Sequence, residues 1–325
     1  MLKKRLHCLL MLNILLLLSL AGYGQGQDEG PGYQMMLIKN PGMAGIDGKS
    51  TVRLSYVNFF PGNNYNFHSV YFSYDSYYQG LHGGTSVYIT DNYLGGIIND
   101  LRGGVSYAYS LKAGRDLFIN AGLSASVVHR GFNFSGAVLP DQIDPLGGVS
   151  LQSSESLTSG GKTVIDIGAG FLFATGRFTG GLAVSHLAEP DLSFSGSSEA
   201  KLRRQLLIHV SGDFTPWSNH DLKLDPLVYA EYQKGYTNGG AGVSFGYRFF
   251  SVCTSFLGDT YKNLNIQSGF SFSAGRFYIY YNYRFNVISG NRFMPLSLLH
   301  QTGLAFSLNA VEKRNEGRTI NFPNL

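Results

Sequence analysis

Few residues in this chain have types and spacings that could support catalysis. Ser185 and His186 are adjacent and Asp191 follows nearby, which are the residue types of a serine hydrolase. No Gly-x-Ser-x-Gly sequence surrounds the serine, and loose proximity of Ser, His and Asp is expected by chance. We therefore expect no catalytic residues and no enzyme.

Metal and cofactor chemistry also lack a motif. The eight histidines are scattered, with no His-Glu-x-x-His sequence and no Cys/His cluster. Glycine-rich stretches at 168–170 and 239–242 lie within alternating segments and lack the Lys-Ser/Thr pair that completes a phosphate loop. The sequence predicts no metal site and no cofactor, and small residues on one face of a sheet explain the glycines.

The first residues of the chain predict export from the cytoplasm. Basic residues at positions 3–5 precede a leucine-rich apolar run that ends near Leu20, and small residues follow up to Gly24. A basic region, an apolar region and small residues together form a secretory signal peptide, which we assign to residues 1–24. A retained membrane anchor is the alternative, disfavoured because the apolar run is short.

Without residues 1–24 the chain is nearly neutral. The sequence has 25 Lys and Arg and 21 Asp and Glu, and three of the basic residues lie at positions 3–5, which leaves 22 against 21. This balance gives no electrostatic reason to expect nucleic acid as a partner. Cys253 is then the only cysteine, so no intramolecular disulfide can form.

The rest of the sequence is a succession of two-faced segments. Apolar residues alternate with Asn, Gly and Ser at 116–130, and similar alternation recurs at 239–249, 263–274 and 276–286. A period of two is typical of a strand with one apolar and one polar face. We predict strands near 51–59, 65–75, 80–90, 101–111, 116–130, 163–174, 177–187, 201–213, 222–232, 239–249, 251–258, 263–274, 276–286 and 300–309.

A transmembrane barrel fits these strands best. After residue 24 no apolar run approaches the length of a membrane helix, so a membrane location requires a barrel. Many strands have the length that crosses a bilayer, and an even number suits closure. A β-sandwich is the alternative, but its strands are usually only about five or six residues long. We predict an all-β protein whose residues 51–309 form an antiparallel transmembrane β-barrel of about 14 strands. We expect this barrel in the outer membrane of the cell, in contact with its lipid.

Two further patterns are typical of such barrels. Tyrosines near strand ends, among them Tyr71, Tyr278 and Tyr280, are consistent with interfacial aromatic girdles. Residues 301–308 resemble the β-signal by which the barrel-assembly machinery recognises its clients. The chain continues beyond Leu308, and we assign residues 310–325 to a C-terminal tail.

Three long connections are expected at the cell surface. Residues 131–162 are far too long for a periplasmic turn, and strand parity places 188–200 and 287–299 on the same side. Such loops could contact a partner, although a flexible loop without a function is an equal alternative. The candidate partner-binding residues are Pro140, Asp141, Asp144, Pro145, Glu189, Pro190, Asp191, Asn291 and Arg292.

A family resemblance comes from the start of the mature chain. Residues 33–45 read YQMMLIKNPGMAG. This opening resembles that of the PorP/SprF family of Bacteroidota outer-membrane proteins, in which a Gln-Tyr-Met-like stretch precedes Asn-Pro-Ala-x-Ala-Gly. Weaker matches follow in the family's order at 103–109, 166–170, 185–190 and 300. The motif residues are Asn40, Pro41, Gly42, Ala44 and Gly45, with Gly42 in place of the usual alanine.

The resemblance implies a role in type IX secretion or gliding motility. Members look like outer-membrane barrels that hold large secreted adhesins at the cell surface through the adhesins' C-terminal domains. Some work beside periplasmic components of the secretion ring. Residues 25–50 could pass through or cap the lumen, either as a structural seal or as a partner-binding plug. An outer-membrane channel or a hydrophobic-solute transporter stays open as the alternative, and it would need a continuous pore.

Overall fold

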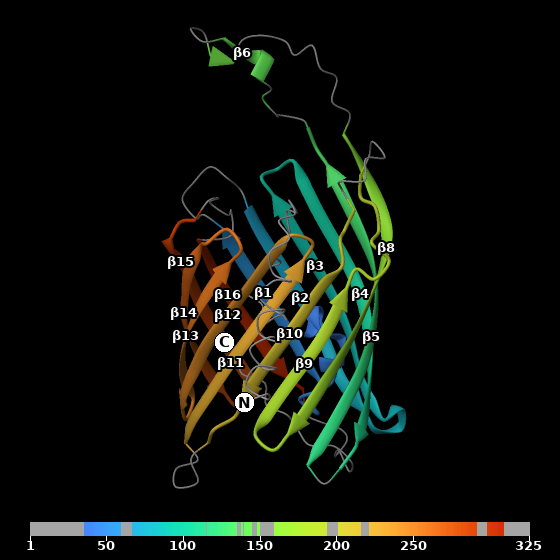
Figure 1. The fold of residues 1–325 in the computed structure, drawn as a ribbon, viewed down its shortest axis with the longest axis vertical. Coiled ribbons are helices and arrows are strands. Elements are labelled where there is room, and N and C mark those ends of the chain that lie inside the picture. Colours follow the sequence, from blue (N-terminus) through green and yellow to red (C-terminus); the bar gives the residue numbers. More distant parts are fainter. Residues whose placement is uncertain are drawn as a thin grey trace, which may run out of the picture.

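The fold is a closed antiparallel barrel of fourteen strands, seen in a computed structural model of the chain (Figure 1). The structure describes residues 36–59, 67–114, 116–134, 138, 140–144, 148–149, 159–193, 201–215, 221–290 and 298–308. Each barrel strand pairs with its two neighbours, and the first strand pairs with the last. The predicted class, strand number and antiparallel order are confirmed.

The barrel strands follow the chain order without a crossover. They are β1 (Thr51–Phe59), β2 (Phe67–Tyr78), β3 (Gly83–Leu94), β4 (Ile98–Lys112), β5 (Leu117–Phe132), β8 (Gly160–Thr175), β9 (Phe178–Ser185), β10 (Gln205–Gly212), β11 (Leu222–Gln233), β12 (Tyr236–Tyr247), β13 (Phe250–Asp259), β14 (Leu264–Ala274), β15 (Phe277–Ile288) and β16 (Leu299–Ser307).

The remaining elements are short. A hairpin of β6 (Ile143–Asp144) and β7 (Gly148–Val149), preceded by η3 (Pro140–Gln142), interrupts the connection between β5 and β8 and lies beyond the rim of the barrel (Figure 1). The other helical turns are α2 (Met36–Lys39), η1 (Pro41–Met43) and η2 (Gln79–Leu81). No helix among the described residues is long and apolar enough to cross a membrane.

The alternation of residue types corresponds to two different environments. On β5, Leu123 and Val127 face outward and are 68% and 50% exposed, whereas Asn120 and Ser126 face the lumen and are buried. An exposed apolar surface that continues around the molecule is unfavourable in water and suits the hydrocarbon of a bilayer. The outward face is therefore the lipid-facing face.

The two ends of the sheet lie on the same side of the barrel. Thr51 at the start of β1 pairs with Ser307 at the end of β16. Three of the four two-residue turns between described strands, 176–177, 248–249 and 275–276, are also on this side, whereas the two longest connections, 133–159 and 186–204, are on the other. Short turns face the periplasm in outer-membrane barrels. The side of Thr51 is thus the periplasmic side, and the long connections face outward from the cell.

Some expected details differ from the structure. β10 begins at Gln205 instead of near 201, because Lys201 forms a bridge with Asp191 and the Leu202 N–H donates to the Pro190 carbonyl. These contacts keep residues 201–204 in the outer connection.

The expected aromatic girdle is also wrong in part. Tyr71 and Tyr280 are 4% and 7% exposed inside the barrel, and Tyr278 lines an internal cavity. The expectation used only their nearness to strand ends. Strand parity decides the direction of each side chain, and these three positions face the lumen.

The lipid-facing assignment predicts the effect of a charge at the middle of the barrel wall. Leu123→Arg should lower the free energy of unfolding by about 2–4 kcal/mol, since an arginine at the bilayer midplane must be desolvated. Leu111→Arg, near the periplasmic end of β4 and 51% exposed, is the matched control and should cost only about 0–1 kcal/mol. Urea titration of the barrel in phospholipid vesicles measures both values. Equal costs at the two positions would contradict the assignment.

Candidate functional site

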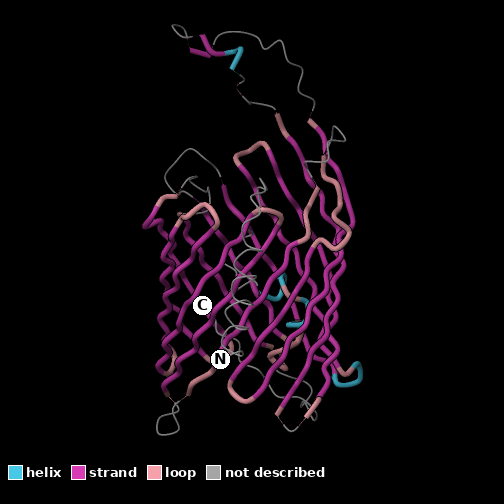
Figure 2. Tube along the Cα trace, viewed as in Figure 1, coloured by secondary structure: helices cyan, strands magenta, loops and turns pink. Residues whose placement is uncertain are grey.

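Residues 36–50, which we call the inner segment, lie inside the barrel. Met36, Asn40 and Ala44 have 1% exposure or less. Figure 2 shows the short helices of this segment within the ring of strands, and η1 contacts β4, β5, β8 and β9. The inner segment therefore occupies the lumen along one wall of the barrel.

Asn40 fixes the turn at the start of η1. Its Oδ1 accepts a hydrogen bond from the Gly42 N–H at 2.9 Å, and Pro41 occupies the first helical position, where a missing N–H costs nothing. The Asn40 Nδ2 donates to the Phe171 carbonyl at 3.2 Å and lies 3.2 Å from His209 Nε2. A single amide side chain thus joins the turn to β8 and β10.

Glycines in the wall allow the turn to approach closely. A Cβ added to Gly122 would lie 2.3 Å from the Pro41 carbonyl carbon, and a Cβ added to Gly170 would lie 2.1 Å from Asn40 Oδ1. Real Cβ atoms do not make contacts this short, so any larger residue would displace the turn. The lumen-facing glycines of β5 and β8 therefore form the seat of the Asn-Pro-Gly motif.

The second half of the motif packs against β3 in the same way. A Cβ at Gly84 would lie 2.0 Å from the Ala44 carbonyl oxygen. Gly45 has a φ of +66° and its own Cβ would lie 2.6 Å from Gly84 Cα, so both the backbone conformation and the space require glycine. The small residues of the motif are explained by these contacts.

A buried ion pair joins the inner segment to β11, two strands beyond β9 in the barrel. Lys39 Nζ lies 2.6 Å from Glu231 Oε1 of β11, and the two side chains are 5% and 2% exposed. Gln205 and Asn238 donate to the other carboxylate oxygen at 3.1 and 3.4 Å. The charge of Glu231 is therefore neutralised and its second oxygen is satisfied, as burial requires.

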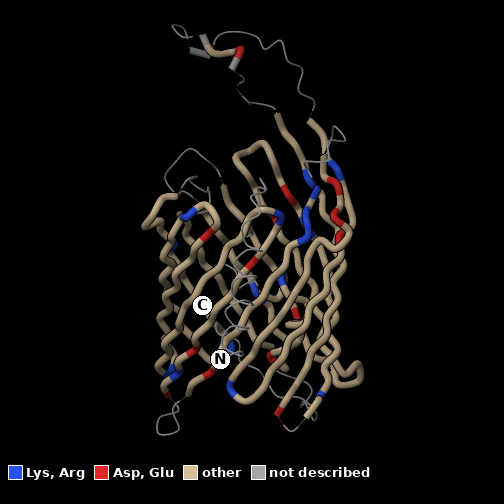
Figure 3. The backbone as a smooth tube through the Cα atoms, viewed as in Figure 1, with Lys and Arg blue, Asp and Glu red and all other residues tan. Residues whose placement is uncertain are grey.

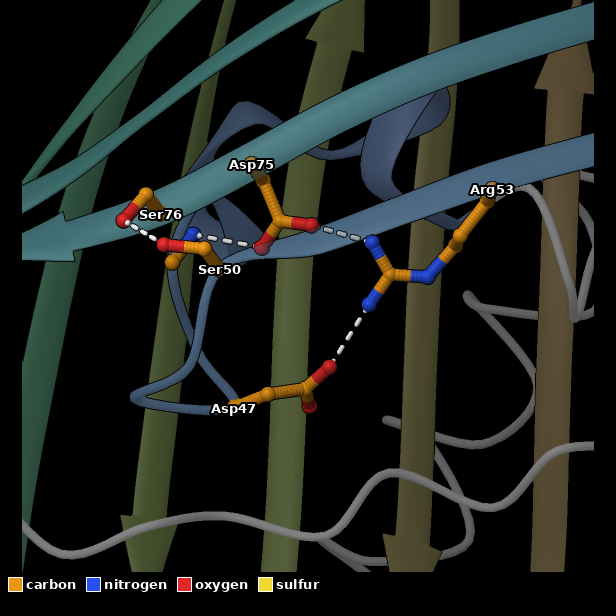
Figure 4. A network of polar contacts seen from close by, with 6 residues as sticks. Asp47, Ser50, Arg53, Asp75 and Ser76 are labelled. Atoms are coloured by element: carbon orange, nitrogen blue, oxygen red, sulfur yellow. Dashed lines mark hydrogen bonds and ion pairs between the residues drawn. The ribbon is translucent and has the colours of Figure 1, made fainter. Parts of the chain in front are cut away.

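A second charged network joins the end of the inner segment to β1 and β2 (Figure 4). Arg53 donates to Asp75 and, at 2.6 Å, to Asp47. The Gly45 N–H donates to Asp75 Oδ2 at 3.1 Å, and the hydroxyls of Ser50 and Ser76 are 2.8 Å apart. The network fixes the inner segment where it turns into the first strand.

The rest of the lumen differs between its two ends. A cavity of about 380 Å³ lies toward the periplasm, between the inner segment and the strands β11 to β16, and charged and hydroxyl side chains line much of it. Toward the outer end, Val57, Phe59 and Leu299 point inward and are almost fully buried together with Tyr71. The described lumen thus has a polar cavity on the periplasmic side, whereas on the outer side an apolar cluster lies alongside buried polar pairs such as Asp100–Arg130 and Asp166–His186.

The outer-loop candidates divide into separate groups. Pro140, Asp141 and Asp144 lie in the projecting hairpin region, while Glu189 and Pro190 lie in the connection after β9. Pro145, Asn291 and Arg292 fall outside the described residues. The structure does not bring the hairpin residues and the β9 connection into one site.

Two acidic candidates stabilise their own connection. Asp191 accepts a hydrogen bond from the Ser193 N–H at 2.8 Å, which lowers the pKa of its carboxyl, and it lies 3.7 Å from Lys162. Glu189 lies 3.8 Å from Arg203. These contacts give both carboxylates a local role in folding the connection.

His186 and Asp191, which resembled members of a hydrolase triad, have different partners in the structure. His186 Nδ1 lies 2.7 Å from Asp166 Oδ2 in a buried pair, and Asp191 instead contacts Ser193 and Lys162. Within the described part of the chain, no group of three or more His, Cys, Asp or Glu could hold a metal ion.

Residues 33–297 match the profile of a family described as the type IX secretion system membrane protein PorP/SprF. The chain belongs to this family. The matched range includes the inner segment with its motif and the strands that hold it, so the PorP/SprF motif corresponds to a turn seated on wall glycines. No curated protein sequence matches the chain.

Solved structures of outer-membrane hydrocarbon channels share the barrel fold of this PorP/SprF protein. The monoaromatic hydrocarbon channel CymD is 11% identical with a TM-score of 0.54, covering 88% of this chain and 95% of that one. The toluene transporter TbuX of Ralstonia pickettii is 12% identical, with a TM-score of 0.51 and coverage of 88% and 97%. The P. putida toluene transporter TodX is 12% identical, with a TM-score of 0.52 and coverage of 90% and 99%. The PorP/SprF chain is an outer-membrane barrel.

The wall glycines predict which substitutions release the inner segment. Gly122→Val should weaken its seating by about 1–3 kcal/mol, because the new side chain overlaps the Pro41 backbone. Gly103→Val is the matched control, since a Cβ there meets nothing within 4 Å. Hydrogen exchange of peptides from residues 36–50 measures the change. Faster exchange in both variants, or in neither, would show that the glycine is not the seat.

The buried ion pair predicts strong coupling between two distant positions. Lys39→Met should destabilise the packed inner segment by about 3–5 kcal/mol, because it leaves the Glu231 carboxylate buried without its cation. The double variant Lys39→Met with Glu231→Gln should recover a large part of this loss. Denaturant unfolding of the four proteins in the cycle gives the coupling energy. Strictly additive effects would rule out a direct pair.

Proposed function

We propose that this PorP/SprF barrel anchors a large secreted adhesin at the cell surface, or helps to deliver it, by binding the adhesin's C-terminal domain. Membership of the type IX secretion family supports a role in protein export. The adhesin is the partner that the family resemblance implies, and periplasmic ring components are the second partner of the proposal.

The observation that carries the proposal is the seated inner segment. An anchor requires a stable barrel and no open pore, and here the lumen contains a segment held by an ion pair, a capped turn and close glycine contacts. A channel would instead need a continuous path. The contacts of residues 36–50 favour a barrel whose interior is packed along one wall.

The outer connections supply a surface on which a partner could dock. The hairpin of β6 and β7 projects beyond the rim, and Val138 and Ile143 are each 51% exposed there (Figure 1). Exposed apolar residues on a projecting loop are typical of interaction sites. We therefore assign adhesin binding in the first place to the connection between β5 and β8.

A channel is the second candidate, because the barrel fold is similar to that of hydrocarbon channels and toluene transporters. This structural similarity supports the barrel fold and gives no evidence that this chain carries the same solutes. Serines, lysines, arginines and aspartates line the periplasmic cavity, and such a lining does not suit an apolar solute. The interior thus favours the anchor over transport of hydrocarbons.

Affinity purification from the native outer membrane, followed by mass spectrometry, tests the proposal. We expect a large surface protein with a type IX C-terminal domain to co-purify with the wild-type barrel. Deletion of residues 138–149 should reduce this capture strongly, since it removes the hairpin. Arg177→Gln, in a periplasmic turn, is the control and should leave capture unchanged.

The same preparation distinguishes the two candidate functions. Recovery of the barrel alone, together with steady conductance in planar bilayers, would overturn the anchor and favour a channel. Capture that persists after the hairpin deletion would show that another surface holds the adhesin.

A further inference from the structure

The periplasmic cavity is lined by charged side chains, and only some of them form ion pairs with one another. It measures about 380 Å³, which lies within the range of pockets that bind ligands, about 300–1,000 Å³. Figure 3 shows acidic and basic positions at both ends of the barrel, including this one. The charged residues of the lining are Asp47, Asp75, Asp221, Asp225, Lys49, Arg53, Lys223, Arg248 and Arg276.

Five of these nine residues are engaged with one another. Arg53 bridges Asp47 and Asp75. Arg248 Nε lies 3.1 Å from Asp221 Oδ2, and this hydrogen bond raises the pKa of the arginine. These pairs account for three carboxylates and two guanidinium groups of the cavity.

The other four residues leave an excess of positive charge. Lys49, Lys223 and Arg276 are exposed and form no ion pair with any described residue, and Asp225 is the one carboxylate outside the pairs. Three cations outside the pairs thus face the cavity, and one of them, Lys223, interacts with Asp225. Over the whole lining, five positive side chains stand against four carboxylates. A site of this kind attracts anions.

The three cations come from separate elements of the fold. Lys49 belongs to the inner segment, Lys223 to the periplasmic end of β11, and Arg276 to the turn between β14 and β15. Buried hydroxyls of Ser244 and Ser271 lie on the wall of the same cavity. The cations surround the space instead of meeting at one point, which fits an extended ligand with several carboxylates.

We propose that this cavity binds an acidic peptide segment of a periplasmic protein. Side-chain carboxylates of the peptide pair with Lys49, Lys223 and Arg276, and serine hydroxyls donate to its carbonyl oxygens. A peptide also offers backbone N–H groups to Asp225, whereas a compact phosphate would be repelled there. The site is separate from the outer loops, so it does not depend on adhesin binding.

Binding of a labelled peptide to the purified full-length barrel tests this site. The probe is a fluorescein-labelled peptide with six glutamates separated by glycine and serine, followed by fluorescence anisotropy in detergent at low salt. We expect saturable binding that weakens as salt rises. The double variant Lys223→Gln with Arg276→Gln should bind at least about tenfold more weakly, a loss of roughly 1.4 kcal/mol.

Lys112→Gln provides the matched control. Lys112 lies at the same end of the barrel but over the Phe118 ring and outside the cavity lining, so its loss should leave peptide affinity unchanged. Heat-modifiable migration on gels verifies that each variant is a folded barrel.

Three results would overturn the proposal. They are the absence of saturable binding to the wild type, an equal loss of affinity in Lys112→Gln, and competition by inorganic phosphate at the same concentration as unlabelled peptide. The last result would identify a phosphate site. Adhesin capture by the same variants reports separately on the outer loops, so failure of this site is distinguishable from failure of the anchor.

Discussion

Pairing of β1 with β16 is the contact on which the rest of the structure depends. The two strands are in register from Thr51 opposite Ser307 to Phe59 opposite Leu299. In a bilayer an unpaired backbone N–H or C=O has no water to bind, so a membrane sheet must have no edge. Closure also separates an inside from an outside, and the period-two alternation of each strand then places its two faces in different media.

Closure alone leaves an interior that must be filled, and the chain fills it unevenly. On the side of β3 to β9, lumen-facing glycines let the inner segment touch the backbone of the wall. On the side of β11 to β16 the inner segment contacts the wall through Lys39 and Glu231, and a polar cavity is left toward the periplasm. The difference arises from side-chain size at a few inward positions, since glycine at Gly122 and Gly170 removes the volume that the Asn40-Pro41 turn occupies.

Much of the fold could be predicted from local pattern, and the site could be predicted only in part. The alternation of a two-faced strand can be recognised from residues close together in the sequence, and it identified all fourteen strands. The family motif separately identified Asn40 to Gly45. The Lys39–Glu231 pair joins residues 192 positions apart, and no local pattern shows that they meet. A lone glutamate on the lumen face of β11 and glycines at inward positions were the available signals. The inward direction of Tyr71 and Tyr280 needed strand parity, which nearness to a strand end does not supply.

The seat of the inner segment bears on the order in which the barrel can assemble. Strands β3, β5, β8 and β9, whose glycines and backbone groups surround the Asn40 turn, all precede β16 in the chain. After closure, the hydrogen bond from the Leu308 N–H to the Ser50 carbonyl joins the chain just before the first strand to the chain just after the last one. A curved half-barrel can therefore receive the inner segment from its open side, and the last strand then seals it in. On this order of events, the inner segment packs against the wall before the barrel closes.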